Sequence, residues 1–307
     1  MKIHTNYFRK YRLLLAALPC LALAVDRAAA ELIAYEPFDY GRVQWYASDS
    51  VLGEGIAGLA GGIGWAGAWT SRGSKNAGIP VYPDDYPAGS RVAPLVYTDG
   101  FGHTLQTSGS QIRTAFGNNS WDQRLLSEPI GELGSTIWVS FLAQSDGIAT
   151  ASPRYAFVEL ENSGTSNPLW LGKVTPNTTG NWGIQMQNAP VTSADFGDDA
   201  KMDLQTFFVM KLEFPDAVDG QTGVSVWLNP LDLTDESALS TPVFSGTMQY
   251  SIWDQVGVRG RYSTDFDEIR IGTSFASVAP VPEPASGFLF GLSMLGGLLW
   301  WWRQRSR

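Results

Sequence analysis

Two carboxylates, Glu159 and Glu161, stand two residues apart in a segment where polar and apolar residues alternate. Side chains two residues apart on a strand point to the same face, so this pair could share one surface. Paired carboxylates across a cleft carry out glycoside hydrolysis. The pair lacks the third carboxylate of the Glu-x-Asp-x-x-Glu motif of some glycan-cleaving enzymes, and Glu159 alternates with Ala156 and Val158 as a solvated strand residue would. We therefore expect no enzymatic activity, with polysaccharide hydrolase or lyase as the less favoured alternative.

Aromatic residues in amide-rich surroundings suggest a second chemistry, carbohydrate binding. Sugar rings pack on flat aromatic faces, and their hydroxyls need hydrogen-bonding partners. Residues 181–188 offer Trp182 with Gln185 and Gln187, and Trp45 and Trp121 also lie in polar segments. These five residues are the carbohydrate-binding candidates, although tryptophan is also common in sandwich cores.

Acidic loops raise the possibility of Ca²⁺, which prefers carboxylate and carbonyl oxygens. Asp195, Asp198 and Asp199 cluster around one glycine, and Asp265 and Asp267 stand at the last predicted strand. Neither group has the spacing of a known calcium loop, so a solvated acidic turn is the alternative. Ca²⁺ is the one cofactor that we keep open.

The elements that position these residues are short strands. Runs with period-two alternation are separated by Gly, Pro, Asn and Asp, and no helical stretch of 12 residues stands out between 31 and 280. This pattern is typical of an antiparallel sandwich or barrel. The clearest strands are expected at 136–142, 154–160, 207–214, 224–228 and 266–271.

The N-terminus predicts export. A basic segment precedes an apolar run at 13–25, and the A-x-A-type site that ends at Ala30 predicts a cleaved signal peptide. The one cysteine, Cys20, is then removed, which excludes disulfides and thiol chemistry from the mature chain. A single histidine, His103, remains after cleavage, so neither a histidine-rich metal site nor a histidine-based nucleophilic mechanism is expected.

Charge excludes another class of partner. Residues 31–280 contain 13 Lys and Arg against 28 Asp and Glu, a net charge of −15. Such a surface repels phosphate backbones, so nucleic-acid binding is not expected. By the same argument, a strongly anionic polysaccharide would need a bridging cation or a local basic patch.

The C-terminal end combines three features in order. Pro282, Glu283 and Pro284 form an extended, exposed motif; 18 uncharged residues follow at 285–302, enough to span a bilayer; and three arginines close the chain. This arrangement resembles the PEP-CTERM sorting signal. The resemblance implies processing by exosortase, a membrane-embedded enzyme, at Pro282, Glu283 and Pro284. It also implies a transient stay in the inner membrane and delivery to the cell surface or extracellular matrix.

Segments in the mature region resemble the concanavalin A-like, or laminin G-like, jelly roll. The resemblance lies in the opening segment 35–40, a Gly-rich turn at 61–65, a hairpin over 208–230 and a closing strand at 266–272. It implies an all-β jelly-roll sandwich whose closing strand returns beside the first.

Together these features predict an exported bacterial surface or matrix protein with a non-catalytic structural or adhesive role in exopolysaccharide. A lectin-like module, with or without Ca²⁺, is the alternative. We expect a signal peptide at 1–30, a jelly-roll domain at 31–275, a linker with the sorting motif at 276–284, a transmembrane helix at 285–302 and a basic cytoplasmic end at 303–307.

Overall fold

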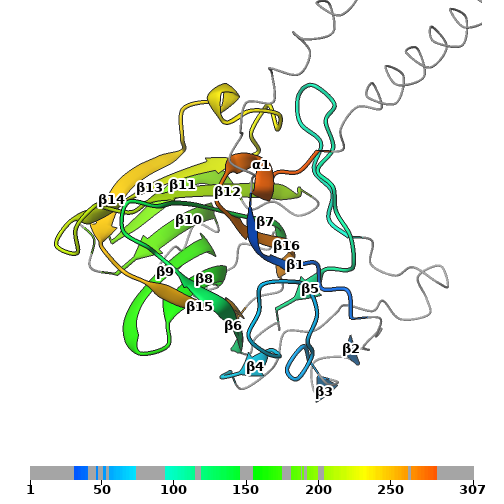
Figure 1. Cartoon of the computed structure of the whole chain (residues 1–307). Helices are drawn as coiled ribbons and strands as arrows, with labels where there is room; N and C mark the ends of the chain where they lie inside the picture. Colours follow the sequence, from blue (N-terminus) through cyan, green and yellow to red (C-terminus); the bar gives the residue numbers. More distant parts are fainter. Residues whose placement is uncertain are drawn as a thin grey trace, which may run out of the picture.

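The structure, a computed structural model, describes residues 31–40, 46–47, 51–52, 55–73, 94–114, 119–145, 155–174, 181–187, 189, 192–199, 204–261 and 264–281. Two seven-stranded antiparallel sheets form a β-sandwich (Figure 1), as predicted. The expected signal peptide and the tail from Pro282 onward, including the expected membrane span, lie outside the described residues. Within the described part, no helix has the length and apolar character needed to cross a bilayer.

The first sheet has the strand order β1-β16-β7-β12-β13-β14, and β5 also pairs with β16. Its closing strand lies antiparallel to its first (Figure 1), with Tyr35 opposite Arg270, as the jelly-roll resemblance implied. The predicted central hairpin is confirmed by β12 and β13, in which Phe208 faces Leu228. The strands are β1 (Leu32–Glu36), β5 (Ile112–Arg113), β7 (Thr136–Ser145), β12 (Thr206–Glu213), β13 (Gln221–Leu228), β14 (Phe244–Gln249) and β16 (Thr264–Gly272).

The second sheet has the order β11-β10-β9-β8-β15-β6-β4. Its strands are β4 (Thr70–Ser71), β6 (Ser120–Ile130), β8 (Ala156–Asn162), β9 (Thr165–Lys173), β10 (Asn181–Met186), β11 (Ser193–Asp199) and β15 (Trp253–Gly260). A separate ribbon joins β2 (Tyr46–Ala47) to β3 (Val51–Leu52), and a short 3₁₀ helix, η1 (Glu236–Ala238), precedes β14.

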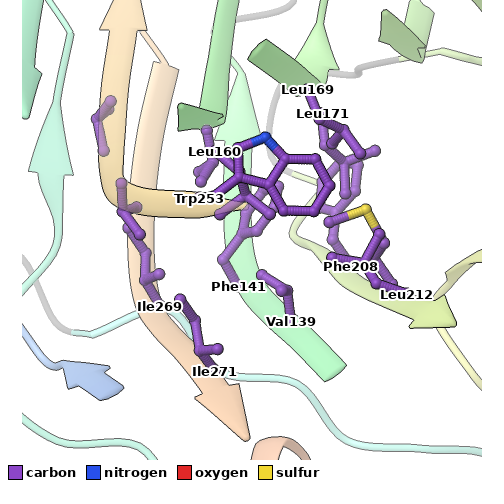
Figure 2. Close-up of a cluster of buried hydrophobic side chains, with 14 of the residues drawn as sticks. Val139, Phe141, Leu160, Leu169, Leu171, Phe208, Leu212, Trp253, Ile269 and Ile271 are labelled. Carbon is purple, nitrogen blue, oxygen red and sulfur yellow. The ribbon is translucent and has the colours of Figure 1, made fainter. Parts of the chain in front are cut away.

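The main core fills the space between the two sheets. Alternation in β12 turns Phe208, Met210 and Leu212 inward, as the sequence predicted. Trp253 lies fully buried between the sheets, among Leu160 and its neighbours (Figure 2), and its Nε1 donates to the carbonyl oxygen of Asn167 at 3.1 Å. Because the indole both fills volume and satisfies its one polar atom, it suits this buried position.

A second apolar cluster covers the outer face of the first sheet. Trp138 and Trp227, predicted to pack, stack there with ring centroids 5.8 Å apart. The short helix α1 (Phe275–Val278) covers these two rings. The ring centroid of Phe275 lies 5.5 Å from that of Trp138, and the Ser140 hydroxyl donates to the carbonyl oxygen of Val278. Residues 276–281, expected as part of a linker, therefore pack on the sandwich.

Candidate functional site

The outer face of the second sheet carries the polar and aromatic residues that could meet a ligand. In β8, Ala156, Val158 and Leu160 belong to the core, so Phe157 and Glu159 point away from it. The same alternation along β6, β9, β10 and β15 places one outward side chain beside the next across the sheet.

One row of register partners crosses five strands and is called here the glutamate row. Gln123 on β6 faces Gly257 on β15, which faces Glu159 on β8. Glu159 in turn faces Trp170 on β9, and Trp170 faces Gln185 on β10. The row thus combines amides, a carboxyl group and an indole on one face, the groups that a sugar ring and its hydroxyls require.

The neighbouring row, called here the arginine row, runs parallel to it. Trp121 on β6 faces Arg259 on β15, which faces Phe157 on β8. Beyond Phe157 stand Gly172 and Gly183, which carry no side chains. Aromatic and cationic groups therefore concentrate at the β6 and β15 end of this row.

The carboxyl group of Glu159 is enclosed by its neighbours. It is only 2% exposed, which corrects the expectation of a solvated strand residue. The indole Nε1 of Trp121 donates to its Oε1 at 2.5 Å, and a Cβ added at Gly257 would stand 2.5 Å from the same oxygen. The absence of a side chain at Gly257 thus makes room for the glutamate.

Burial raises the pKa of Glu159 from 4.5 to about 7. The negative charge of Glu161 adds to this rise, while the hydrogen bond from Trp121 and the nearby Arg259 and Arg72 oppose it. At neutral pH the Glu159 carboxyl group is therefore protonated in part of the molecules and charged in the rest.

Glu161, the other half of the predicted pair, is held by different partners. Its Oε2 accepts from Gln255 Nε2 at 2.6 Å and from Arg72 at 3.3 Å. The two carboxylates lie on the same outward face, as predicted, but each is engaged by protein donors.

Arg259 is fixed by two aromatic rings. Its guanidinium carbon lies 4.3 Å from the Trp121 ring centroid and 5.5 Å from that of Tyr155. The Tyr155 hydroxyl donates to Asn119 Oδ1 at 2.8 Å, which orients that ring. Stacking holds the cation in one place while its fork of N–H donors keeps its capacity to bind.

Three polar atoms of the glutamate row lack a hydrogen-bond partner in the protein: Gln123 Oε1, Trp170 Nε1 and Gln185 Oε1. The Trp170 ring stacks on Phe157 at 4.8 Å with an angle of 18° between the planes, and it is half-buried. Buried polar atoms without partners are costly, so these three would gain from hydrogen bonds to a ligand if neighbouring side chains moved to admit it.

The strongest carbohydrate candidate from the sequence is corrected by the structure. Trp182 is fully buried in the core with Ile184 and Met186, and its Nε1 donates to Thr206 Oγ1 at 3.0 Å. It is thus unavailable to a sugar. Gln185 points outward within the glutamate row.

The other carbohydrate candidates have different outcomes. Trp121 lies half-buried in the arginine row, and Gln187 is half-buried just beyond β10. Trp45 lies outside the described residues.

The candidate calcium ligands do not come together as a described cluster. Asp195 accepts from Asn181 Nδ2 at 3.0 Å and from the Gly197 amide at 2.8 Å, while the side chains of Asp198 and Asp199 lie outside the described part. Asp265 forms a bidentate pair with Arg113.

Asp267 is also an unsuitable calcium ligand. It accepts from the backbone amides of Leu95 and Glu268, and burial raises its pKa well above the usual value. With both carboxylate oxygens engaged by backbone amides and the side chain buried, Asp267 is not open to a cation from solvent.

Among the described residues, one group of three side chains comes close enough to hold a metal: Asp99, His103 and Asp232. Asp99 Oδ2 accepts from His103 Nδ1 at 2.8 Å and from the Leu233 amide at 2.9 Å. Burial disfavours the charged form of Asp99, but hydrogen bonds from Leu233, His103 and Phe101 outweigh it and lower its pKa to about 2. These contacts give Asp99 a structural role joining two loops.

The sequence interpretation missed Trp170, Arg259 and Gln123. A signal for Trp170 was present, because it alternates with Leu169 and Leu171, which are both buried in the core. Arg259 likewise follows Val258 in a strand whose valines point inward. Neither segment is rich in amide side chains, so a search for aromatic residues in polar segments did not select Trp170 or Arg259.

Comparison with known proteins identifies one family model. The PEP-CTERM protein-sorting motif matches residues 280–304, which confirms the resemblance stated for the C-terminal end. The motif marks a secreted protein that exosortase sorts to the cell surface. No curated protein matches the chain.

Several solved structures are similar to the chain at low sequence identity. Domain 4 of AbnA, an extracellular arabinanase from Geobacillus stearothermophilus, has a TM-score of 0.41 at 14% identity, covering 81% of this chain and 97% of that one. The endo-β-1,4-glucuronan lyase from Trichoderma reesei has a TM-score of 0.38 at 10% identity, covering 72% and 95%. The Emp46p carbohydrate recognition domain has a TM-score of 0.37 at 8% identity, covering 55% and 85%.

Proposed function

We propose that this secreted surface protein, sorted through its PEP-CTERM motif, is a non-catalytic adhesive component of an exopolysaccharide matrix. The outer face of the second sheet binds the polysaccharide, with the glutamate row and the arginine row as the contact surface. The sorting enzyme acts on the tail, at Pro282, Glu283 and Pro284, and the sandwich holds the glycan.

The glutamate row is the observation that carries this proposal. Trp170 presents a half-buried ring, and its Nε1 and the side-chain oxygens of Gln123 and Gln185 are buried atoms on the same face without a partner in the protein, which sugar hydroxyls would reach once neighbouring side chains move. Protein carbohydrate sites need a ring for the apolar face of the sugar and donors and acceptors for its hydroxyls. Register pairing fixes Trp170 and Gln185 side by side on adjacent strands, so they can meet one ligand together.

Enclosure of Glu159 supports a role without catalysis. A general acid must come within hydrogen-bonding reach of the atom that it protonates. Glu159 is 2% exposed and already accepts from Trp121, and Glu161 is held by Gln255 and Arg72. The raised pKa of Glu159 is the one observation that favours the enzymatic alternative, because such shifts gather at active sites.

Affinity electrophoresis tests the binding proposal. The full chain, kept in a nonionic detergent, is run through gels that contain neutral or acidic polysaccharides, with and without a chelator. We expect retardation by at least one polymer. Trp170→Ala should weaken it by about fivefold, because a lost aromatic contact is worth about 1 kcal/mol.

Phe101→Ala is the matched control, since Phe101 is an exposed aromatic on a loop outside the two rows. It should leave retardation unchanged. Equal loss in both variants, or no retardation of the wild-type chain by any polymer, would overturn the proposed binding surface.

Turnover assays test the absence of catalysis. The same polymers are incubated with the full chain and assayed for new reducing ends and for unsaturated products. We expect neither. Product formation that disappears in Glu159→Gln would replace the adhesive proposal with the enzymatic one.

A further inference from the structure

We infer that the polysaccharide bound by this surface carries carboxylate groups, and that Arg259 receives them. This inference rests on the proposed function and goes beyond it by naming the class of glycan. It follows from the surroundings of one guanidinium.

Arg259 differs from all but one of the other arginines in the described part of the chain, the exception being the exposed Arg261. Arg72, Arg113, Arg124 and Arg270 each form an ion pair with a carboxylate. In the same ranges, Arg259 has no carboxylate oxygen within 4.0 Å, and its one hydrogen-bonding contact is a long one of 3.5 Å to Asn119 Oδ1. Its N–H donors thus remain available for an incoming acceptor.

The guanidinium group of Arg259 is also held in position before any ligand binds. Arg259 is half-buried, and its guanidinium carbon lies over the rings of both Trp121 and Tyr155. Removing a charge from water without a counter-charge is costly, so a stacked and partly desolvated guanidinium gains more from an anion than a freely solvated one does. A planar carboxylate matches the geometry of its fork, with two parallel hydrogen bonds.

The carboxyl group of Glu159 does not serve as the counter-charge of Arg259. It lies in the next row, its Oε1 accepts from Trp121, and it is not within ion-pair distance of Arg259. Burial raises its pKa to about 7, so its repulsion of an incoming carboxylate is reduced at neutral pH and below. The groups around Arg259 therefore repel a ligand carboxylate only weakly.

The overall charge makes such a local arrangement necessary. A net charge of −15 over residues 31–280 repels polyanions in general. Recognition of an acidic glycan then depends on a few positioned cations, and Arg72, whose guanidinium carbon lies 5.4 Å from the centroid of the same indole, is a second cation beside this ring. Binding should consequently weaken as salt is raised.

The experiment compares acidic polymers with their uncharged esters. The full chain in nonionic detergent is run through gels that contain polygalacturonate, alginate or hyaluronate, each alongside its methyl ester, and through a gel that contains dextran sulfate. We expect retardation by an acidic polymer and little by its ester, since methyl esterification removes the charge and leaves the sugar backbone unchanged. Arg259→Gln should reduce the retardation about tenfold, the loss expected for one charge-assisted pair.

Two further variants separate the specific effect from general charge and from misfolding. Arg261→Gln removes an exposed arginine two residues away, and retardation should persist. Arg259→Lys keeps the charge but not the fork, and should retain an intermediate part of the binding. Thermal melting of each variant identifies any that fail to fold, in which case the lysine variant decides the outcome.

The results distinguish this inference from the proposed function. Equal retardation by acid and ester, with loss in Trp170→Ala, overturns the carboxylate inference and leaves glycan binding in place. No retardation by any polymer overturns both. Retardation by dextran sulfate as strong as that by the uronates, or equal loss in Arg259→Gln and Arg261→Gln, also overturns the inference, because the interaction would then be a general response to charge.

Discussion

Replacing Glu159 with glutamine should remove a pH dependence from the stability of the sandwich. In the folded chain burial raises the pKa of this carboxyl group to about 7, whereas an exposed glutamate titrates at 4.5. Below pH 4.5 the carboxyl group is protonated in both the folded and the unfolded chain, so it does not lower the free energy of unfolding. Between pH 4.5 and 7 the unfolded chain gives up this proton while the folded chain keeps it, so unfolding becomes easier, and above pH 7 the folded chain ionises as well and the loss levels off.

The size of the effect follows from the two pKa values. Each pKa unit between the folded and unfolded states is worth 1.36 kcal/mol, so the wild-type chain loses about 3 kcal/mol of unfolding free energy between pH 4.5 and pH 8. Glutamine imitates the protonated form and can still accept from Trp121. The variant should therefore match the wild type at pH 4.5 and exceed it by about 3 kcal/mol at pH 8.

Urea unfolding, followed by tryptophan fluorescence at three pH values, measures this difference. Comparing two chains cancels the titration of all other groups, including the buried Asp267 and Glu268, whose pKa values burial also raises. Glu128→Gln, at an exposed position on β6, is the control and should follow the wild type at every pH. Parallel pH curves for wild type and Glu159→Gln would refute the account of an enclosed carboxyl group.

Three other substitutions test the packing that positions the site. Trp253→Ala should lower the unfolding free energy in urea by about 3–5 kcal/mol, because the indole is fully buried between the sheets. Trp182→Phe should lower it by about 1–2 kcal/mol through loss of the hydrogen bond to Thr206, and glycan retardation of the folded chain should persist; selective loss of retardation would show instead that Trp182 contacts the sugar. Gly257→Ala should cost about 1–3 kcal/mol, since the new Cβ would displace the Glu159 carboxyl; unchanged stability would show that this contact relaxes freely.

Much of the fold could be predicted because alternation is a local property. The inward set Phe208, Met210 and Leu212 and the inward pair Ile269 and Ile271 were evident from period-two patterning alone. The pairing of the closing strand with the first came instead from family resemblance, because antiparallel partners separated by more than 200 residues leave no local mark.

The candidate site was harder to predict, for two physical reasons. The amide-rich neighbours of Trp182 suggested a surface position, but Trp182 alternates in register with Ile184 and Met186 and therefore points into the core. Which face a strand residue occupies depends on its position in the alternation more than on the polarity of its segment. At Glu159, burial depends on Trp121 and Gly257, which arrive from other strands. Only the assembled register brings an indole donor and an empty position beside the same carboxyl group.

The two ends of the described chain lie at the first sheet, whereas the proposed glycan surface lies on the second. The first residue described, Glu31, hydrogen-bonds through its amide to Thr273, and α1 lies at the first sheet (Figure 1). Val281 packs with α1 against the second apolar cluster, on the outer face of that sheet. The glutamate and arginine rows lie on the outer face of the second sheet, across the main core. Both ends of the described chain therefore meet the fold on the side opposite to these rows. Attachment through the C-terminal sorting signal would leave the proposed glycan surface unobstructed by the residues that lead into that signal.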